Sequence, residues 1–110
     1  MYAVDKGAQK INGQIVETFH REVRDRATLM DVEAGTTGYK GGCCRASGCR
    51  TFLSLMCQSG DFFFGPIPDD EGRIVGIDIA CCGDDGLNAV LRALDFARDV
   101  INDQRRHVKD

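Results

Sequence analysis

The sequence predicts an α+β fold, a two-layer sandwich in which an N-terminal and a C-terminal helix cover one face of an antiparallel sheet of about four strands. Apolar residues recur at helical spacing near both ends of the chain and alternate with polar residues through its middle, and short turn sequences separate the middle segments. With 43% hydrophobic and 28% charged residues, the composition is typical of a globular protein, and we expect residues 1–110 to form a single domain.

Two segments carry the helical pattern. Residues 11–27 place apolar side chains on one stripe, at Ile11, Ile15, Val16, Phe19, Val23 and Ala27. Residues 87–102 do the same, with Leu87, Val90, Leu91, Leu94, Ala97 and Ile101. Asp84 or Asp85 is suited to cap the start of this second helix, because short polar side chains bond the free N–H groups there.

Four segments between the helices alternate as strands do, and they cover residues 29–34, 51–58, a run that begins at 62, and 73–82. Turn sequences at 58–61 and 69–72 separate the last three segments, which favours an antiparallel meander. Two helices cover only one face of such a sheet. The bare face would carry Phe52, Met56 and part of the run Phe62 to Phe64, and we expect a homodimer to bury it, through that face or the sheet edge.

The net charge of −3 gives no general attraction to nucleic acid or to an anionic membrane. The first residues lack the pattern of a secretory signal, and the apolar runs are short. We therefore expect a cytoplasmic protein with neither nucleic-acid nor membrane partners. Thiols stay reduced in that compartment, so the six cysteines are expected to be free or metal-bound.

A glycine-rich segment, residues 35–49, is the first candidate for a binding site. Long loops of this kind often carry function. The candidate residues for a small molecule or a protein partner are Thr36, Thr37, Tyr39 and Lys40. The phosphate-binding pattern G-x-x-x-x-G-K-[ST] is missing, because Lys40 precedes Gly41 and Gly42 and a strand follows.

The cysteines are a second candidate. If the fold brings them together, zinc could be held by Cys43, Cys44, Cys49 and Cys82. His20 could replace Cys82 as the fourth ligand. A structural zinc site usually has two ligand pairs of the C-x2-4-C type. Here only Cys44 and Cys49, with four residues between them, come near that spacing. Cys57 and Cys81 are expected to be buried as small apolar residues.

Carboxylates on the sheet are the third candidate. Asp31 and Glu33 share one strand face, and Asp78 could lie on the same face of the sheet. Such a group could bind a divalent cation or exchange protons with a substrate. Neither His20 nor His107 has a sequence-adjacent Ser, Cys or Asp that forms a recognised catalytic signature. A small enzyme that uses the sheet carboxylates is therefore kept as an alternative.

Residues 32–42 (VEAGTTGYKGG), followed by residues 50–53 (RTFL), resemble a pattern in small uncharacterised bacterial proteins of the kind carried on mobile gene cassettes. The resemblance covers the middle third of the chain and implies a compact bacterial, cytoplasmic domain. Those proteins have no assigned activity to carry over, and the cysteine-rich segment 43–49 is not part of the pattern. The residues favour the prediction of a homodimeric binding or interaction protein without catalytic activity. The alternatives are a zinc-stabilised module and a small enzyme.

Overall fold

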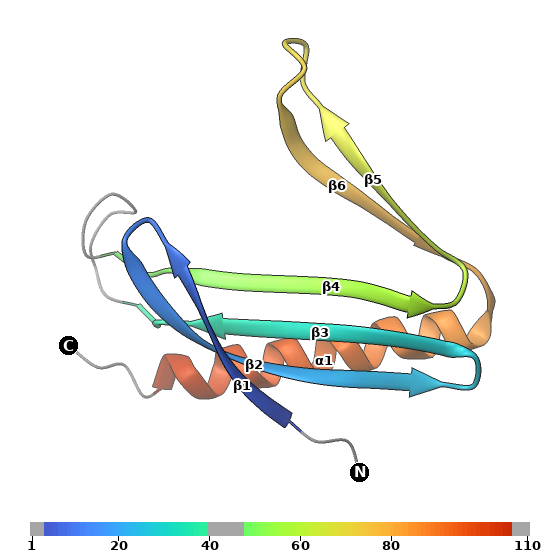
Figure 1. Cartoon of the computed structure of the whole chain (residues 1–110), viewed down its shortest axis with the longest axis horizontal. Helices are drawn as coiled ribbons and strands as arrows, with labels where there is room; N and C mark the ends of the chain where they lie inside the picture. Colours follow the sequence, from blue (N-terminus) through green and yellow to red (C-terminus); the bar gives the residue numbers. More distant parts are fainter. Residues whose placement is uncertain (1–3, 40–47, 107–110) are drawn as a thin grey trace.

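The computed structural model describes residues 4–39 and 48–106. Within them the chain forms β1 (Val4–Ile11), β2 (Gln14–Asp25), β3 (Thr28–Thr36), β4 (Thr51–Ser59), β5 (Phe62–Pro68), β6 (Ile74–Cys81) and α1 (Gly83–Arg106). Strands β1 to β4 form one antiparallel sheet in sequence order, and β5 and β6 form a separate two-stranded sheet (Figure 1). The mixed α+β class and the C-terminal helix are thus confirmed.

The predicted N-terminal helix is wrong, because residues 11–27 belong to a β-hairpin instead. Asn12 and Gly13 form a two-residue turn with φ values of 45° and 83°. Asn-Gly is the preferred pair in such turns, because both positions need a left-handed backbone. Strand β2 then runs back along β1, with Val16 opposite Gln9 and Phe19 opposite Lys6.

All four predicted strands are present, but they do not form one sheet. Strand β3 pairs with β2 on one side and with β4 on the other. Strand β5 pairs only with β6, so the predicted meander of the last three strands is wrong at the junction of β4 and β5. The hairpin β5–β6, which we call the arm, projects away from the body (Figure 1).

Helix α1 packs on the sheet through small residues. Gly86, Ala89, Ala93 and Ala97 are buried and face β3 and β2. They contact a core from the sheet made by Val23, Met30, Val32 and Ala34. The predicted inward stripe of larger residues is therefore wrong for Leu87, Leu91 and Leu94, whose exposed fractions are 54%, 52% and 46%.

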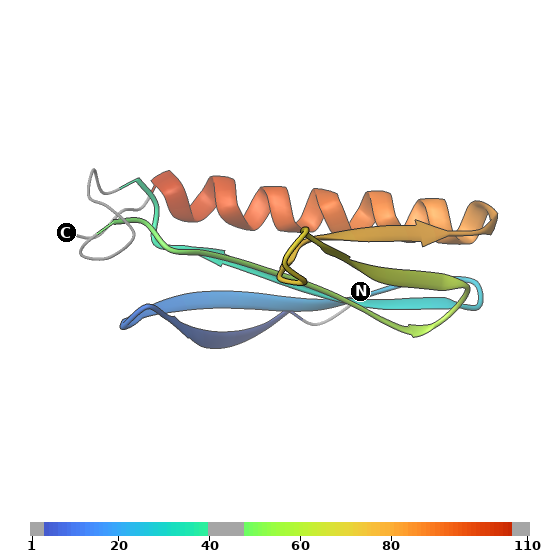
Figure 2. The same cartoon turned by 90° about the horizontal axis from the view of Figure 1, so that it is seen from above.

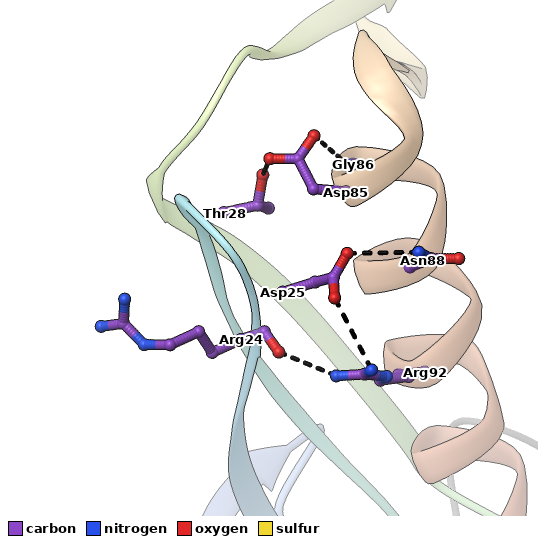
Figure 3. Close-up of polar contacts among 7 residues, drawn as sticks. All are labelled: Arg24, Asp25, Thr28, Asp85, Gly86, Asn88 and Arg92. Carbon is purple, nitrogen blue, oxygen red and sulfur yellow. Dashed lines mark hydrogen bonds and ion pairs between the residues drawn. The ribbon is translucent and has the colours of Figure 1, made fainter.

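Polar contacts fix the start of α1 on the turn between β2 and β3 (Figure 3). The Thr28 hydroxyl donates a hydrogen bond of 2.8 Å to Asp85. Asn88 donates to Asp25 at 3.2 Å, and Arg92 donates to the Arg24 carbonyl at 2.8 Å. These contacts fix one flank of the helix on β2 and leave the flank toward β4 free.

The molecule is flat and open. Figure 2 shows α1 in one layer and β1 to β4 in the other, and the whole measures 43 × 43 × 17 Å. Its radius of gyration is 15.5 Å, whereas a compact chain of this length has about 13 Å. Among the described residues, no helix is both long and apolar enough to cross a membrane.

Candidate functional site

The two predicted ligand-binding threonines join the ends of β3 and β4. The buried Thr36 hydroxyl shares a hydrogen bond of 2.9 Å with Thr51 and accepts one of 3.1 Å from the Gly38 N–H. The Thr37 hydroxyl accepts a bond of 3.0 Å from the Arg50 N–H, and the Thr37 N–H donates to the Arg50 carbonyl at 2.9 Å. Both side chains thus hold the loop ends together.

Cys49 lies beside these threonines, with its sulfur 3.3 Å from the Thr36 hydroxyl and 3.5 Å from that of Thr51. Partial burial alone raises the pKa of the Cys49 thiol, but hydrogen bonds from Thr36, Thr51, Thr37 and the Gly38 N–H lower it, and the net pKa is below its usual value. A small cavity of about 90 Å³ adjoins the sulfur and is lined by Thr36, Gly38, Tyr39, Cys49, Thr51, Ile101 and Arg105.

The structure does not bring the predicted zinc ligands together where it describes them. Cys49 is near the last turns of α1, whereas Cys82 directly precedes its first residue. A helix of 24 residues is about 36 Å long, which separates the two thiols by most of the molecule. Cys43, Cys44 and Lys40 lie outside the described residues. Within 4–39 and 48–106, no group of three or more acidic, histidine or cysteine residues could hold a metal ion.

The sheet face away from α1 is polar, which corrects the expectation of a bare apolar face. Glu33 lies there, where it accepts hydrogen bonds of 2.6 Å from the Thr18 hydroxyl and 3.1 Å from Gln9. Thr18 is completely buried, so these contacts stabilise the β1–β2 hairpin on the sheet. Phe52 is half-buried and Met56 exposed on this face, but both stand among polar neighbours.

Asp31 shares the face with Glu33, as the alternation predicted. Its carboxylate lies 3.3 Å from His20 Nε2 and accepts a hydrogen bond from Gln58. His20 Nδ1 is also 4.0 Å from Asp5 on β1. Asp78, the third predicted carboxylate, is on the arm and thus belongs to a different sheet. The three acids therefore form no common site, and two of them link strands of the sheet.

The arm carries the largest run of exposed apolar side chains on the described chain. One face consists of the cross-strand pairs Phe62 with Cys81, Phe64 with Ile79, and Pro66 with Ile77. The exposed apolar residues of this face, from 59% to 37% accessible, are Ile77, Val75, Ile79 and Phe64. The opposite face also exposes Phe63, Ile74 and Ile67. A two-stranded hairpin that exposes such residues is marginally stable in water, so the arm is a candidate interaction surface.

The base of the arm is fixed on the body. Phe62 packs against the hydrophobic core, and Cys81 lies against Gly86 at the start of α1. The Cys82 N–H donates a backbone hydrogen bond of 3.2 Å to the Asp61 carbonyl, which closes the base. From this base the arm leaves the body on the side of β4 (Figure 1).

A second exposed apolar surface lies on α1. We call Leu87, Leu91 and Leu94 the leucine stripe. Their helical spacing places them on the flank opposite Asn88 and Arg92, which contact β2, so the stripe faces the side of β4 and the arm. Helix α1 thus has two apolar stripes, one of small residues on its own sheet and one of leucines in water.

Sequence reasoning missed the arm and the outward direction of the leucines. A signal for the outward leucines was present. The small residues at positions 86, 89, 93 and 97 have the same helical spacing as the leucines. A helix with two apolar stripes is expected to have two neighbours, and the described residues supply only one of them, the four-stranded sheet.

No protein-family model, curated protein or solved structure matches the chain.

Proposed function

We propose that this protein is a homodimeric interaction protein that acts by binding and not by catalysis. The observation that carries the proposal is the apolar arm, which projects into water with its side chains exposed. In this proposal the chain is a bacterial, cytoplasmic protein, as its sequence suggested. Its partner is a second copy of itself, through which it presents a larger surface to any further ligand.

The amount of exposed surface supports self-association. The chain has a solvent-accessible area of 7585 Å², whereas a compact monomer of 12.1 kDa exposes about 6,000 Å². The surplus exceeds the roughly 800 Å² that each partner contributes to a standard protein interface. A dimer that buries the arm would therefore bring the chain to the surface area of an ordinary folded protein.

The polar contacts of the sheet support binding over catalysis. Glu33 and Asp31 are engaged with neighbouring strands, and the threonines near Cys49 hold the loop ends. These contacts maintain the fold, and neither carboxylate lines the small cavity beside Cys49. The zinc-stabilised alternative gains no support, since Cys49 and Cys82 are at opposite ends of α1.

The experiment is a mass measurement in solution. Size-exclusion chromatography with light scattering on the full chain, from 1 to 100 µM, should give twice the mass of one chain over the upper part of that range. Ala80→Asp, on the other face of the arm, should leave the mass unchanged, while Ile77→Asp with Ile79→Asp should halve it. A monomeric wild-type chain at 100 µM would disprove the proposal.

A further inference from the structure

We infer that each arm packs its apolar face on the leucine stripe of the other copy, so that the two chains of the dimer exchange arms. This inference rests on the proposed homodimer and specifies which surfaces meet in it. The surfaces are the arm face formed by Phe64, Ile77 and Ile79 and the stripe formed by Leu87, Leu91 and Leu94.

The two surfaces match in character and in length. The part of β5 beyond the fixed base, from Phe64 to Pro68, covers four residue steps, or about 13 Å. The stripe, from Leu87 to Leu94, covers seven residue steps of the helix, or about 11 Å. A flat two-stranded ribbon can lie along a helix flank of that length, and each chain supplies one of each surface. A two-fold dimer then buries both surfaces twice.

An arm cannot reach the stripe of its own chain. Its base is held by Phe62 in the core and by the backbone bond between Cys82 and Asp61. From there the arm diverges from both β4 and α1 (Figure 1), so its outer half is far from its own helix. Its apolar face can therefore meet a leucine stripe only on another molecule.

The flank of α1 that carries the stripe is open to such a ribbon. Helix α1 packs over β3 and β2, and β4 is the last strand of its sheet. Leu53 of β4, on the helix side of the sheet, is consequently 52% exposed. The arm of a second molecule would thus contact apolar side chains of α1 and, beyond the helix, of β4.

Charge-swap complementation tests the inference. The arm variant is Ile77→Asp with Ile79→Asp, and the stripe variant is Leu91→Lys with Leu94→Lys. All four positions are exposed, so each variant should keep the wild-type circular dichroism spectrum. Alone, each variant should be monomeric at 20 µM, because charge then faces an apolar surface in both contacts of the dimer.

Mixing the two variants should restore a dimer, seen by native mass spectrometry as a heterodimer. One of its contacts is wild type, and the other pairs Asp with Lys. The controls are Ala80→Asp on the opposite face of the arm and Asp95→Lys, which changes the charge by the same +2 as the stripe variant. Both controls should stay dimeric.

The outcomes separate the inference from the proposal it rests on. A monomeric wild-type chain would overturn both the homodimer and the arm exchange. A dimeric wild type whose stripe variant also stays dimeric, or whose two variants do not form a heterodimer on mixing, overturns arm exchange and leaves the homodimer standing. A variant that is unfolded alone but forms the heterodimer on mixing still supports arm exchange, because the rescue requires the complementary surface.

Discussion

At the scale of single residues, a buried arginine and a hydroxyl-lined thiol have the most specific surroundings. The Arg50 side chain is nearly buried, and its guanidinium donates to the carbonyls of Gly48 at 2.8 Å, Ile11 at 3.1 Å and Asn12 at 3.3 Å. It therefore connects the start of β4 to the β1–β2 turn. Buried charges persist in proteins when hydrogen bonds of this kind satisfy them.

Arg50→Met should destabilise the protein by about 2–3 kcal/mol, because it keeps the apolar stem but removes the guanidinium hydrogen bonds to the carbonyls of Gly48, Ile11 and Asn12. Chemical denaturation at a fixed protein concentration measures the change. Arg73→Met is the control, since Arg73 is exposed and pairs on the surface with Asp69, and it should change stability by about 0.5 kcal/mol or less. Equal effects of the two substitutions would contradict this role of Arg50.

The thiol of Cys49 should react faster with iodoacetamide at neutral pH than an ordinary cysteine, because its lowered pKa raises the thiolate fraction. Thr51→Val removes one hydroxyl from the sulfur, so the midpoint of the pH–rate curve should rise. Thr51→Ser keeps the hydroxyl and should leave the midpoint in place. Peptide-resolved mass spectrometry follows Cys49 separately from the other thiols. An unchanged midpoint in Thr51→Val would show that this bond does not lower the pKa.

At the scale of elements, the apolar residues between positions 11 and 23 fit both the helical repeat and the strand repeat. Ile11, Ile15, Phe19 and Val23 are each four residues apart, a spacing that suits one face of a strand as well as one stripe of a helix. Val16 favoured the helix prediction, because adjacent apolar residues such as Ile15 and Val16 can share a helical stripe but not one face of a strand. The Asn12–Gly13 pair, which requires left-handed backbone at both positions, should have decided for a hairpin.

Strand β3 depends on a close approach to β2 at Gly35. A Cβ atom there would lie 2.2 Å from the Glu17 carbonyl oxygen and 2.9 Å from Thr18 Cα, both of them backbone atoms. Gly35→Ala should therefore cost about 3 kcal/mol or more, since the strands would have to separate. Gly65→Ala on the arm meets nothing within 4 Å and should change stability by less than about 1 kcal/mol. Thermal unfolding of the two variants measures the difference, and a tolerated Gly35→Ala would contradict the close packing.

At the scale of the whole molecule, the body is flat, the arm projects from it, and helix α1 has an exposed leucine stripe beside its buried stripe of small residues. The leucine stripe and the apolar residues of the arm together form the kind of exposed apolar surface that marks an interaction site. In the proposed homodimer, stability depends on the protein concentration, because dissociation would expose these surfaces again.

The melting temperature of the wild-type protein should rise with protein concentration, by about 3 °C for each tenfold increase, as expected for a dimer of this size. The arm variant, Ile77→Asp with Ile79→Asp, should melt at a lower temperature that does not depend on concentration. Differential scanning calorimetry at three concentrations gives both results. A wild-type melting temperature that does not change with concentration would contradict a dimer that dissociates on unfolding.

The sequence by itself determined the mixed class, the four strands after residue 27, the C-terminal helix and the shared face of Asp31 and Glu33. Those features follow from local alternation, turn residues and helical spacing, which are properties of neighbouring positions. Only the tertiary structure decided that alanines and not leucines of α1 face the sheet, that β5 leaves β4, and that Cys49 and Cys82 lie far apart. The physical reason is that burial depends on which surfaces meet. Small residues let the helix approach the sheet closely, and the leucines on the neighbouring flank are then left exposed where the structure describes them.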